Sequence, residues 1–548
     1  MDITYYDTLI GHVPFQKVAL AILVFAFVGY FIYRALFPIS YPRDLPRLGE
    51  KEGISWRAMR QKFHTDCTAV FKDAYENYSK KGRSVLIPVF GPHDEVILPP
   101  SSLQWLCRQP DEVASSLHAQ IDSIQLDHSL GHKFAHDPWG GMLIKTDLNS
   151  ALESVCAVMN DEVAAAFDDC FGTDVDAWKE LDLFPACRIL AGRATLGFTL
   201  GDSPEGRRLC RDQKFVESCY GALDGMLETA GAMAATRKFL RPIQGPWASR
   251  IMRKKLDDLK TRFEPLYRER MHIIEQQAAG KDIRVPEDLI QMMLQYALKE
   301  RPEELVSLDD ITKRLAVSNF GTMHQTVITL HNLLLNVVGS DSKFDTISVL
   351  RDELSRIITD GGSNGVTTRW TRSQVASMTR ADSVARETLR VNSFIGRTVQ
   401  RLVIAPGGLV TEDGIRLPQG TMVSILAHQS QTDEEKFENP EEYDPFRFSR
   451  AREAAAYKST GKPGLSHLSF VSTSSDYLAF SHGKHACPGR FLVDFELKMT
   501  MAYALRNYDI EFPESYGGKR PPNFWFAGFG IPPMEAKVRV RRRKEDTV

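Results

Sequence analysis

The stretch FSHGKHACPGR (residues 480–490) lies near the C-terminus and runs directly into an apolar segment with helical spacing. It reads as a loop that presents one cysteine, Cys487, at the start of a helix. At that position the helix dipole and the free backbone N–H groups favour the thiolate over the thiol. A lone thiolate held in this way is a soft, electron-rich ligand that suits a haem iron. Phe480 can cover the ligand, and Gly483 and Gly489 let the backbone approach a flat macrocycle.

The alternative interpretation of Cys487 is a structural cysteine before a helix, which is the usual role of a cysteine in a large chain. The other seven cysteines fit that bland interpretation, because no pair has CxxC spacing and they are scattered along the chain. They are predicted to be reduced, small hydrophobic residues of the core.

Residues 480–490 resemble the haem-binding loop of the cytochrome P450 family, most closely fungal membrane-bound members with the form GxHxCPGR. The resemblance implies a mainly α fold with small β-sheets and a haem b whose axial ligand and only protein metal ligand is Cys487. It also places Phe480, Gly483 and Gly489 around the cofactor. His485 stands where many members carry an arginine that contacts a haem propionate, and histidine can donate the same hydrogen bond.

Three charged residues match a second family feature, a structural cluster of one glutamate and two arginines. Glu387-Thr-Leu-Arg390 has the ExxR spacing of the family's K helix, and Arg447 follows in Asp444-Pro-Phe-Arg447. ExxR alone is uninformative, since an exposed i,i+3 pair contributes only about 0.2–0.5 kcal/mol. The later arginine makes a buried cluster the better interpretation.

Two further basic residues match positions that contact the haem propionates in the family. Arg401 begins a predicted strand after the K helix, and a guanidinium suits bidentate carboxylate binding. Arg397 competes with it four residues earlier. Lys145 falls where the family's C helix places a basic partner, and a solvated surface lysine is an equally good interpretation.

The chain departs from the family in the middle of a long predicted helix, Phe320-Gly-Thr-Met-His324-Gln325-Thr326. The family usually has an acid followed by threonine, which relay protons during oxygen activation. Here His324 replaces the acid and Gln325 the threonine, and Thr326 lies about 100° further around the helix. Three interpretations remain: water relays the protons directly and monooxygenation is preserved, a substrate hydroxyl serves as the relay, or the reaction is a rearrangement that needs no standard activation of dioxygen. A satisfied interior histidine remains the alternative for His324.

The N-terminus predicts a membrane anchor at residues 18–37. Residues 18–33 contain no charged side chain, and the helix continued past Arg34 to residue 37 spans about 30 Å. Basic residues after it place the bulk of the chain on the cytoplasmic side of the endoplasmic reticulum membrane, with residues 1–17 in the lumen. Prolines in residues 38–49 predict a stiff spacer. Residues 50–548 then form one haem-binding catalytic domain.

Helical periodicity dominates this domain, as in residues 250–280 and 307–338, and strand-like runs such as 398–404 are short. Ser307 is predicted to cap the longest helix and Gly339 to end it. The net charge of −2 over 548 residues excludes a nucleic-acid-binding protein.

The leading hypothesis is a haem-thiolate monooxygenase that hydroxylates, epoxidises or repeatedly oxidises a bulky lipophilic secondary metabolite such as a terpenoid or polyketide. It would use O2 and electrons from NADPH through a partner NADPH–cytochrome P450 reductase, with cytochrome b5 as an optional second donor. Residues 318–327, 391–395 and 525–531 are predicted to line the substrate pocket. The alternatives are a haem-thiolate isomerase or dehydratase, favoured by Gln325, and a non-catalytic haem- or steroid-binding membrane protein.

Overall fold

The computed structural model describes residues 24, 27–29, 39–91, 93–237, 240–360, 369–458 and 466–544. The predicted lumenal segment, 1–17, and nearly all of the predicted anchor, 18–37, lie outside these ranges. None of the helices within them is both long enough and apolar enough to cross a membrane.

The predicted spacer, residues 38–49, is shorter in the structure than the sequence suggests. Leu45 and Leu48 are buried, and the Leu48 N–H donates to the Leu86 carbonyl at 3.0 Å. The spacing of the prolines gives no sign of this packing. Burial of the two leucines favours packing of the segment on the domain over an extended linker.

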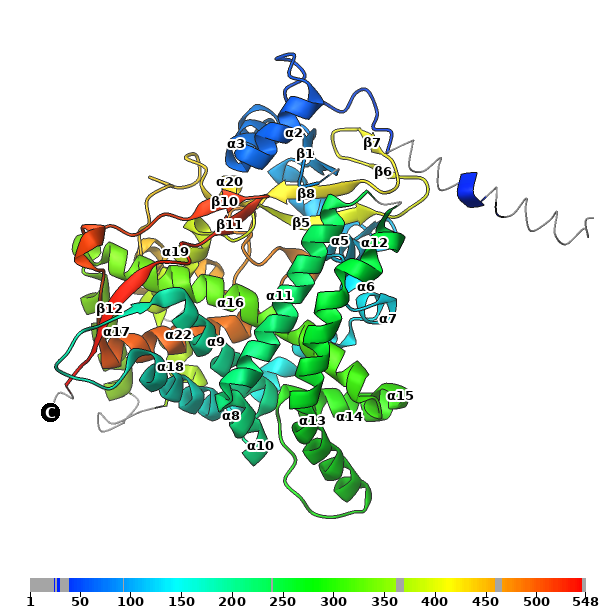
Figure 1. Ribbon diagram of the computed structural model, residues 1–548. Coiled ribbons are helices and arrows are strands. Elements are labelled where there is room, and N and C mark those ends of the chain that lie inside the picture. Colours follow the sequence, from blue (N-terminus) through cyan, green and yellow to red (C-terminus); the bar gives the residue numbers. More distant parts are fainter. Residues whose placement is uncertain are drawn as a thin grey trace, which may run out of the picture.

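A mixed five-stranded sheet joins distant parts of the chain (Figure 1). Its order is β1 (Val85–Pro88), β2 (Asp94–Ile97), β8 (Met422–Leu426), β5 (Arg397–Val403) and β3 (Ala114–Ser115). Only β2 and β8 pair in parallel, and the other neighbours pair antiparallel. Helices α2 (Trp56–Thr65) and α3 (Cys67–Asn77) pack beside it through Phe63 and Phe71.

Helices make up most of the remaining chain. Between α3 and the central part of the domain lie α4 (Leu103–Arg108), α5 (Ser116–Ile124), α6 (Leu126–Ser129), α7 (His132–His136) and α8 (Trp139–Phe171). They are followed by α9 (Leu183–Leu200), α10 (Pro204–Arg211), α11 (Gln213–Ala235), α12 (Arg241–Ala248), α13 (Arg250–Ala278), α14 (Leu289–Glu300) and α15 (Pro302–Leu305). The last helices are α16 (Leu308–Phe344), α17 (Thr346–Asp360), α18 (Arg372–Ser377), α19 (Thr379–Val391), α20 (Ala427–Gln431), α21 (Arg447–Lys458) and α22 (Arg490–Asn507).

The described residues form three smaller sheets. They are β4 (Lys179–Asp182), β12 (Lys537–Arg542) and β9 (Tyr508–Glu511); β10 (Phe524–Phe526) and β11 (Phe529–Ile531); and β6 (Leu409–Val410) and β7 (Arg416–Leu417). The basic residues of β12 are therefore part of a sheet, paired with β4 on one side and β9 on the other.

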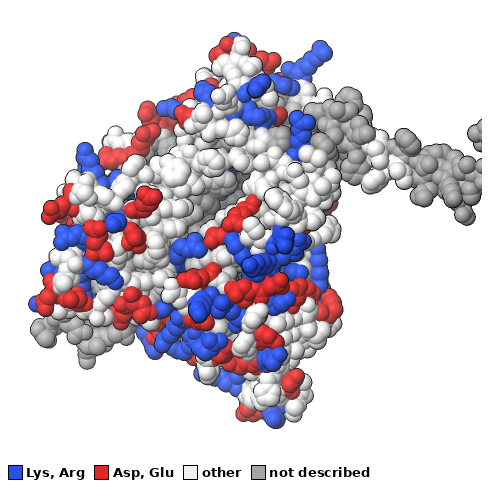
Figure 2. All heavy atoms as spheres, viewed as in Figure 1, with Lys and Arg blue, Asp and Glu red and all other residues white. Residues whose placement is uncertain are grey.

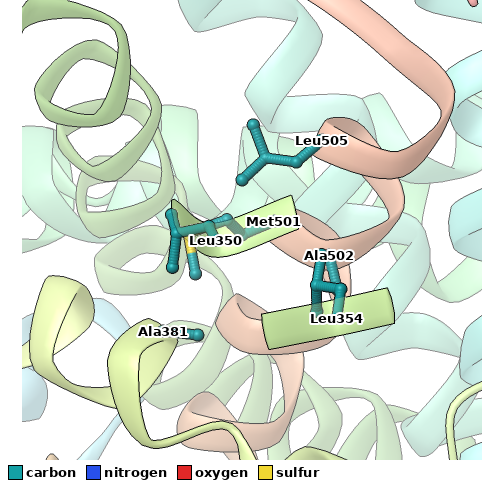
Figure 3. Close-up of a pocket in the computed structure, with 6 residues that line it drawn as sticks. All are labelled: Leu350, Leu354, Ala381, Met501, Ala502 and Leu505. Atoms are coloured by element: carbon teal, nitrogen blue, oxygen red, sulfur yellow. The ribbon is translucent and has the colours of Figure 1, made fainter. Parts of the chain in front are cut away.

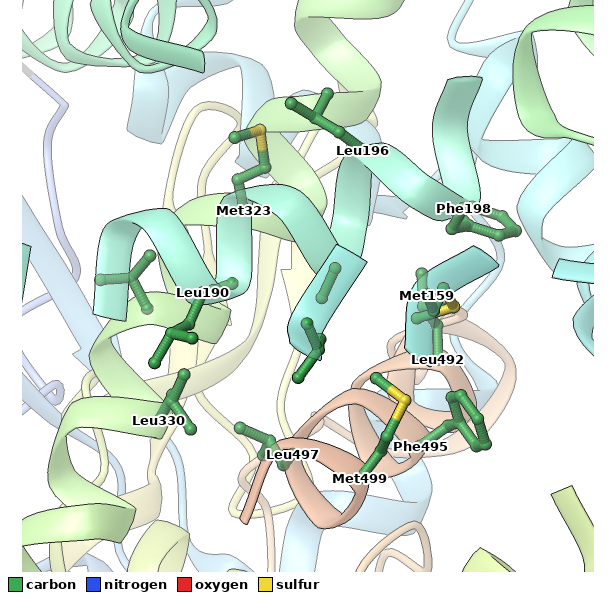
Figure 4. Close-up of a cluster of buried hydrophobic side chains, with 14 of the residues drawn as sticks. Met159, Leu190, Leu196, Phe198, Met323, Leu330, Leu492, Phe495, Leu497 and Met499 are labelled. Atoms are coloured by element: carbon green, nitrogen blue, oxygen red, sulfur yellow. The ribbon is translucent and has the colours of Figure 1, made fainter. Parts of the chain in front are cut away.

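The main core lies where α8, α9, α16 and α22 cross (Figure 4). α22 is buried on nearly all sides, because side chains such as Leu492, Phe495 and Met499 find apolar partners on different helices. Each fully buried large apolar side chain contributes about 1.5–3 kcal/mol. The chain thus holds two helices in a rigid frame: α16, which carries His324, Gln325 and Thr326, and α22, which follows the cysteine loop.

α16 begins where the sequence predicts and ends later. The Ser307 hydroxyl accepts from the Asp310 N–H at 3.2 Å, as an N-cap should. The predicted end at Gly339 is wrong: the helix continues to Phe344, and Asp345 at φ 49° caps it. A Cβ at Gly339 would stand 2.9 Å from the Arg520 Cβ, so this glycine serves close packing rather than helix termination.

The packing of α17, α19 and α22 leaves a small apolar gap, shown in Figure 3. Leu350, Leu354, Ala381, Met501, Ala502 and Leu505 line it. The gap does not admit a water molecule, so it is a packing void and not a ligand site.

Candidate active site

The loop at residues 480–490 has the shape that its glycines suggest. The Cys487 N–H donates to the Phe480 carbonyl at 2.9 Å, and an Arg490 guanidinium N–H donates to the Cys487 carbonyl at 2.6 Å. Gly483 has φ 71°, and a Cβ there would stand 3.1 Å from the Cys107 side chain. The loop therefore needs glycine at this position, and it places Cys487 just before α22.

Opposing effects act on the pKa of the Cys487 thiol. Burial raises its pKa, while the backbone N–H groups of Gly489 and Arg490 and the charge of Arg490 lower it. As predicted, the backbone N–H groups at the helix start favour the thiolate, but in the protein without a metal ion burial outweighs them and the pKa of the thiol is raised. The charge of a bound metal ion would provide the further stabilisation that the thiolate needs, since a metal deprotonates a coordinating thiol.

A buried helix presents an opening in the middle of the domain. Gly321 is exposed although Ser318, Asn319, Thr322 and Met323 around it on α16 are buried. Apart from Gly321, its two chain neighbours and the adjoining backbone of α16, no heavy atom of the described residues lies within 4 Å of the place where its Cβ would stand. An open space against a glycine on a core helix is what a flat macrocycle requires.

The two competing arginines of β5 have different surroundings. Arg397 forms an ion pair with Glu95. Arg401 is 1% exposed, donates from Nη1 to the Gln400 carbonyl at 2.8 Å, and its buried Nη2 has no hydrogen-bond partner among the described residues. A buried guanidinium with a free donor requires an anionic partner. Of the two, Arg401 is thus the one able to bind a carboxylate ligand.

A bulge in β5 aims Arg401. The register with β8 shifts between Thr398 and Arg401, and Val399 inside the shift has φ 54°. A β-branched residue at positive φ is strained, and bulges of this kind redirect neighbouring side chains near functional sites.

Glu387, Arg390 and Arg447 form one hydrogen-bonded cluster. Arg390 binds both carboxylate oxygens of Glu387, at 2.7 and 2.8 Å, and Arg447 Nε binds one of them at 3.1 Å. The remaining guanidinium N–H groups donate to backbone carbonyls of residues 431–442. The cluster ties α19 to the segment that leads to α21.

Comparison with known proteins decides the assignment. A sequence model of the cytochrome P450 family matches residues 211–540. The chain is 45% identical to cytochrome P450 monooxygenase pbrC of Penicillium brasilianum, over 95% of this chain and 96% of that one. It is 44% identical to monooxygenase astC of Aspergillus terreus, over 96% and 97%. The chain belongs to the cytochrome P450 family.

A solved structure supports the fold. The retinoic-acid-bound cyanobacterial CYP120A1 aligns with a TM-score of 0.61 over 92% of this chain and all of the other, at 16% identity. The predicted fold class, mainly helical with small sheets, is confirmed for the described residues. As a cytochrome P450 monooxygenase, the protein uses haem with a cysteine thiolate ligand and O2.

The residues present fit this cofactor. Cys487 offers the sulfur ligand, Gly321 leaves room against α16, and Arg401 has an unused buried donor. His485 is less available than predicted, since its Nε2 lies 2.9 Å from Asp111 Oδ1. Lys145 is exposed on α8, and no hydrogen bond in the described structure joins it to these residues.

On α16 of this P450, the three predicted residues His324, Gln325 and Thr326 have different surroundings. Thr326 donates to the Thr322 carbonyl at 2.6 Å and also lies near the buried Glu496 of α22. The Gln325 Oε1 is buried and accepts no hydrogen bond within the described structure. The hydroxyl of Thr326 is thus engaged by the Thr322 carbonyl and by Glu496; that Thr326 cannot replace the family's threonine stays a prediction from its angle around the helix.

His324 lies in a short polar chain. Its Nε2 is 3.7 Å from Asp224 Oδ1 on α11, and Arg188 on α9 donates to the other Asp224 oxygen at 3.4 Å. Burial lowers the pKa of His324, Asp224 raises it and Arg188 lowers it. Histidine with a carboxylate partner can hold a proton or pass one on.

Asp111, Asp224 and Arg188 are polar partners that the sequence did not reveal. No motif marks them, because each meets its partner across a separate helix or loop. The open space at Gly321 has only a weak signal in the sequence: a single glycine inside a helix whose other residues suit the core.

Proposed function

We propose that this monooxygenase oxidises a bulky lipophilic secondary metabolite, such as a terpenoid or polyketide, with electrons from NADPH delivered by a separate reductase. The carrying observation is the aromatic hairpin β10–β11: Phe524, Phe526 and Phe529 are 56%, 54% and 48% exposed. Trp525 alternates to the other side and packs against His428, with ring centroids 4.8 Å apart.

The hairpin lies beside a predicted pocket segment. Phe529 bridges Ile395, and the Gly530 N–H donates to the Phe394 carbonyl at 3.1 Å. Figure 2 shows mostly uncharged side chains over this part of the face, around a hollow. Exposed aromatic rings favour apolar ligands over polar ones.

When bound, haem with its thiolate ligand supplies the activation of O2 and the transfer of one oxygen atom to substrate. Cys487 would provide the sulfur and Arg401 would bind a propionate. Gln325 can orient water through its amide, but it cannot release and regain a proton as a hydroxyl does. His324 would hold or pass on a proton at Nε2, supported by Asp224.

The proposal also covers cellular placement. Residues 18–37 would anchor the chain in the endoplasmic reticulum membrane, and the catalytic domain, residues 50–548, would face the cytoplasm, where the reductase and cytochrome b5 act. A lipophilic substrate partitions into such a membrane, which would place enzyme and substrate together.

An isomerase or dehydratase is the second candidate, favoured by the buried and unpartnered Gln325 amide oxygen. Incubation with 18O2, NADPH, reductase and candidate substrates separates the two. The proposal requires product that carries one 18O atom and depends on NADPH. Product formed without NADPH and without the label would favour the isomerase.

A further inference from the structure

A group of metal-binding side chains lies on the surface away from the cysteine loop. Asp127 is on α6 and His132 and His136 are on α7, and one ligand atom from each lies within 4.8 Å of the others. Asp127 Oδ1 is 3.3 Å from His132 Nδ1 and 3.1 Å from His136 Nε2. α6 and α7 are neighbours at one edge of the molecule (Figure 1).

The spacing of the two histidines favours chelation. His132 and His136 are four residues apart on one helical turn, so both rings project from the same face. Their centroids are 3.9 Å apart, with 37° between the planes. Ligands bound tetrahedrally at about 2.0–2.1 Å from zinc lie roughly 3.4 Å apart, so small side-chain rotations complete the geometry.

The backbone beneath these ligands is fixed. Leu130, Phe134 and Ala135 are buried in the main core, and Gly131 at φ 97° makes the turn from α6 to α7. Arg314 of α16 donates to the Asp137 carbonyl just after α7. Ligands on a rigid scaffold lose little entropy when they bind an ion.

The ligands themselves are open to solvent. The side chains of Asp127, His132 and His136 are 40%, 81% and 28% exposed. An ion can therefore enter without unfolding the segment, and water can fill a fourth position. Two imidazoles and one carboxylate with an open position form a donor set that suits Zn²⁺.

We propose that Asp127, His132 and His136 bind one Zn²⁺ ion, which joins α6 to α7. The site is independent of the haem reaction, since none of its ligands is among the residues that form the candidate active site. Binding would stabilise the α6–α7 turn in proportion to the zinc affinity, because the ion binds the folded arrangement only.

The test uses the full-length, haem-loaded protein without a polyhistidine tag. The protein is first treated with a chelator, and zinc is then titrated in competition with a chromophoric chelator. One zinc per chain, in addition to the haem iron, is expected. Co²⁺ in its place should give the visible bands of a four-coordinate ion.

Variants assign the ligands. His136→Gln and Asp127→Asn should each weaken zinc binding at least about tenfold, since each removes one of three protein ligands. His272→Gln is the matched control: His272 is an exposed histidine of α13 beside Glu275, and among the described residues it belongs to no group of three possible metal ligands. Equal zinc affinity in all four proteins, or no saturable binding by the wild type, would overturn the proposal. Unchanged circular dichroism shows that the exposed-site variants fold.

Discussion

Replacing Glu387 with glutamine removes the negative charge that Arg390 and Arg447 share. The side chains of Glu387 and Arg390 are both fully buried, so the variant leaves a buried guanidinium charge without an anionic partner. Removing one member of a buried ion pair costs about 3–5 kcal/mol for this reason. The backbone carbonyls that Arg390 also binds offset only part of this cost.

The expected shift in melting temperature follows from the size of the domain. Roughly 500 residues at about 2.1 cal/mol/K each give an unfolding entropy of about 1 kcal/mol/K. Glu387→Gln should therefore lower the melting temperature by about 3–5 °C in scanning calorimetry of the haem-loaded protein at one scan rate.

An exposed pair provides the control. Glu264 and Arg268 form an i,i+4 ion pair on α13, with Arg268 75% exposed. Such a pair contributes about 0.5 kcal/mol or less, so Glu264→Gln should shift the melting temperature by less than about 1 °C. If Glu387→Gln also melts within about 1 °C of the wild type, the reasoning about a buried charge cluster is refuted.

Arg401→Leu should weaken haem binding about 10- to 100-fold, because a hydrogen bond to a charged group contributes about 1.5–3 kcal/mol. Arg397→Leu leaves Glu95 without its ion-pair partner and should lower the stability of the fold instead. Haem titration of each apoprotein measures the haem affinity, and equal affinities of the wild type and Arg401→Leu would contradict the prediction. Burial raises the pKa of Glu496 to about 8, so the native state binds more protons than the unfolded state and wild-type stability falls as pH rises from about 5 to 8. The stability of Glu496→Gln, measured by melting curves, should not fall over this pH range. A pH profile identical to that of the wild type would contradict the raised pKa of Glu496. Gln325→Ala should change the coupling of NADPH use to product more than haem content, and loss of haem would show a structural role.

Local spacing made part of the site predictable. The Cys487 loop lies within eleven residues, and Glu387 and Arg390 lie one turn apart on a helix. In both cases the residues that act together are close in sequence or on one face, so periodicity and motif spacing suffice. The choice between Arg397 and Arg401 needed the structure, because Glu95 is more than 300 residues away.

Other features depend on contacts that spacing does not encode. Asp224 reaches His324 from a separate helix, and Asp111 takes up the nitrogen that His485 was expected to offer a propionate. The predicted helix end at Gly339 is wrong because a glycine that permits close packing against Arg520 has the same sequence signal as a glycine that ends a helix. Burial of Cys487, which opposes the helix dipole, is likewise a property of the assembled core.

The identity of the haem ligand is the claim on which the rest depends. Reduced, carbon-monoxide-bound protein should show the Soret shift of a thiolate-ligated haem, and Cys487→Ala should lose it. Cys107→Ala, which removes a thiol packed beside Gly483 of the same loop, should keep it. The thiolate spectrum in Cys487→Ala, or its loss only in Cys107→Ala, would contradict the assignment.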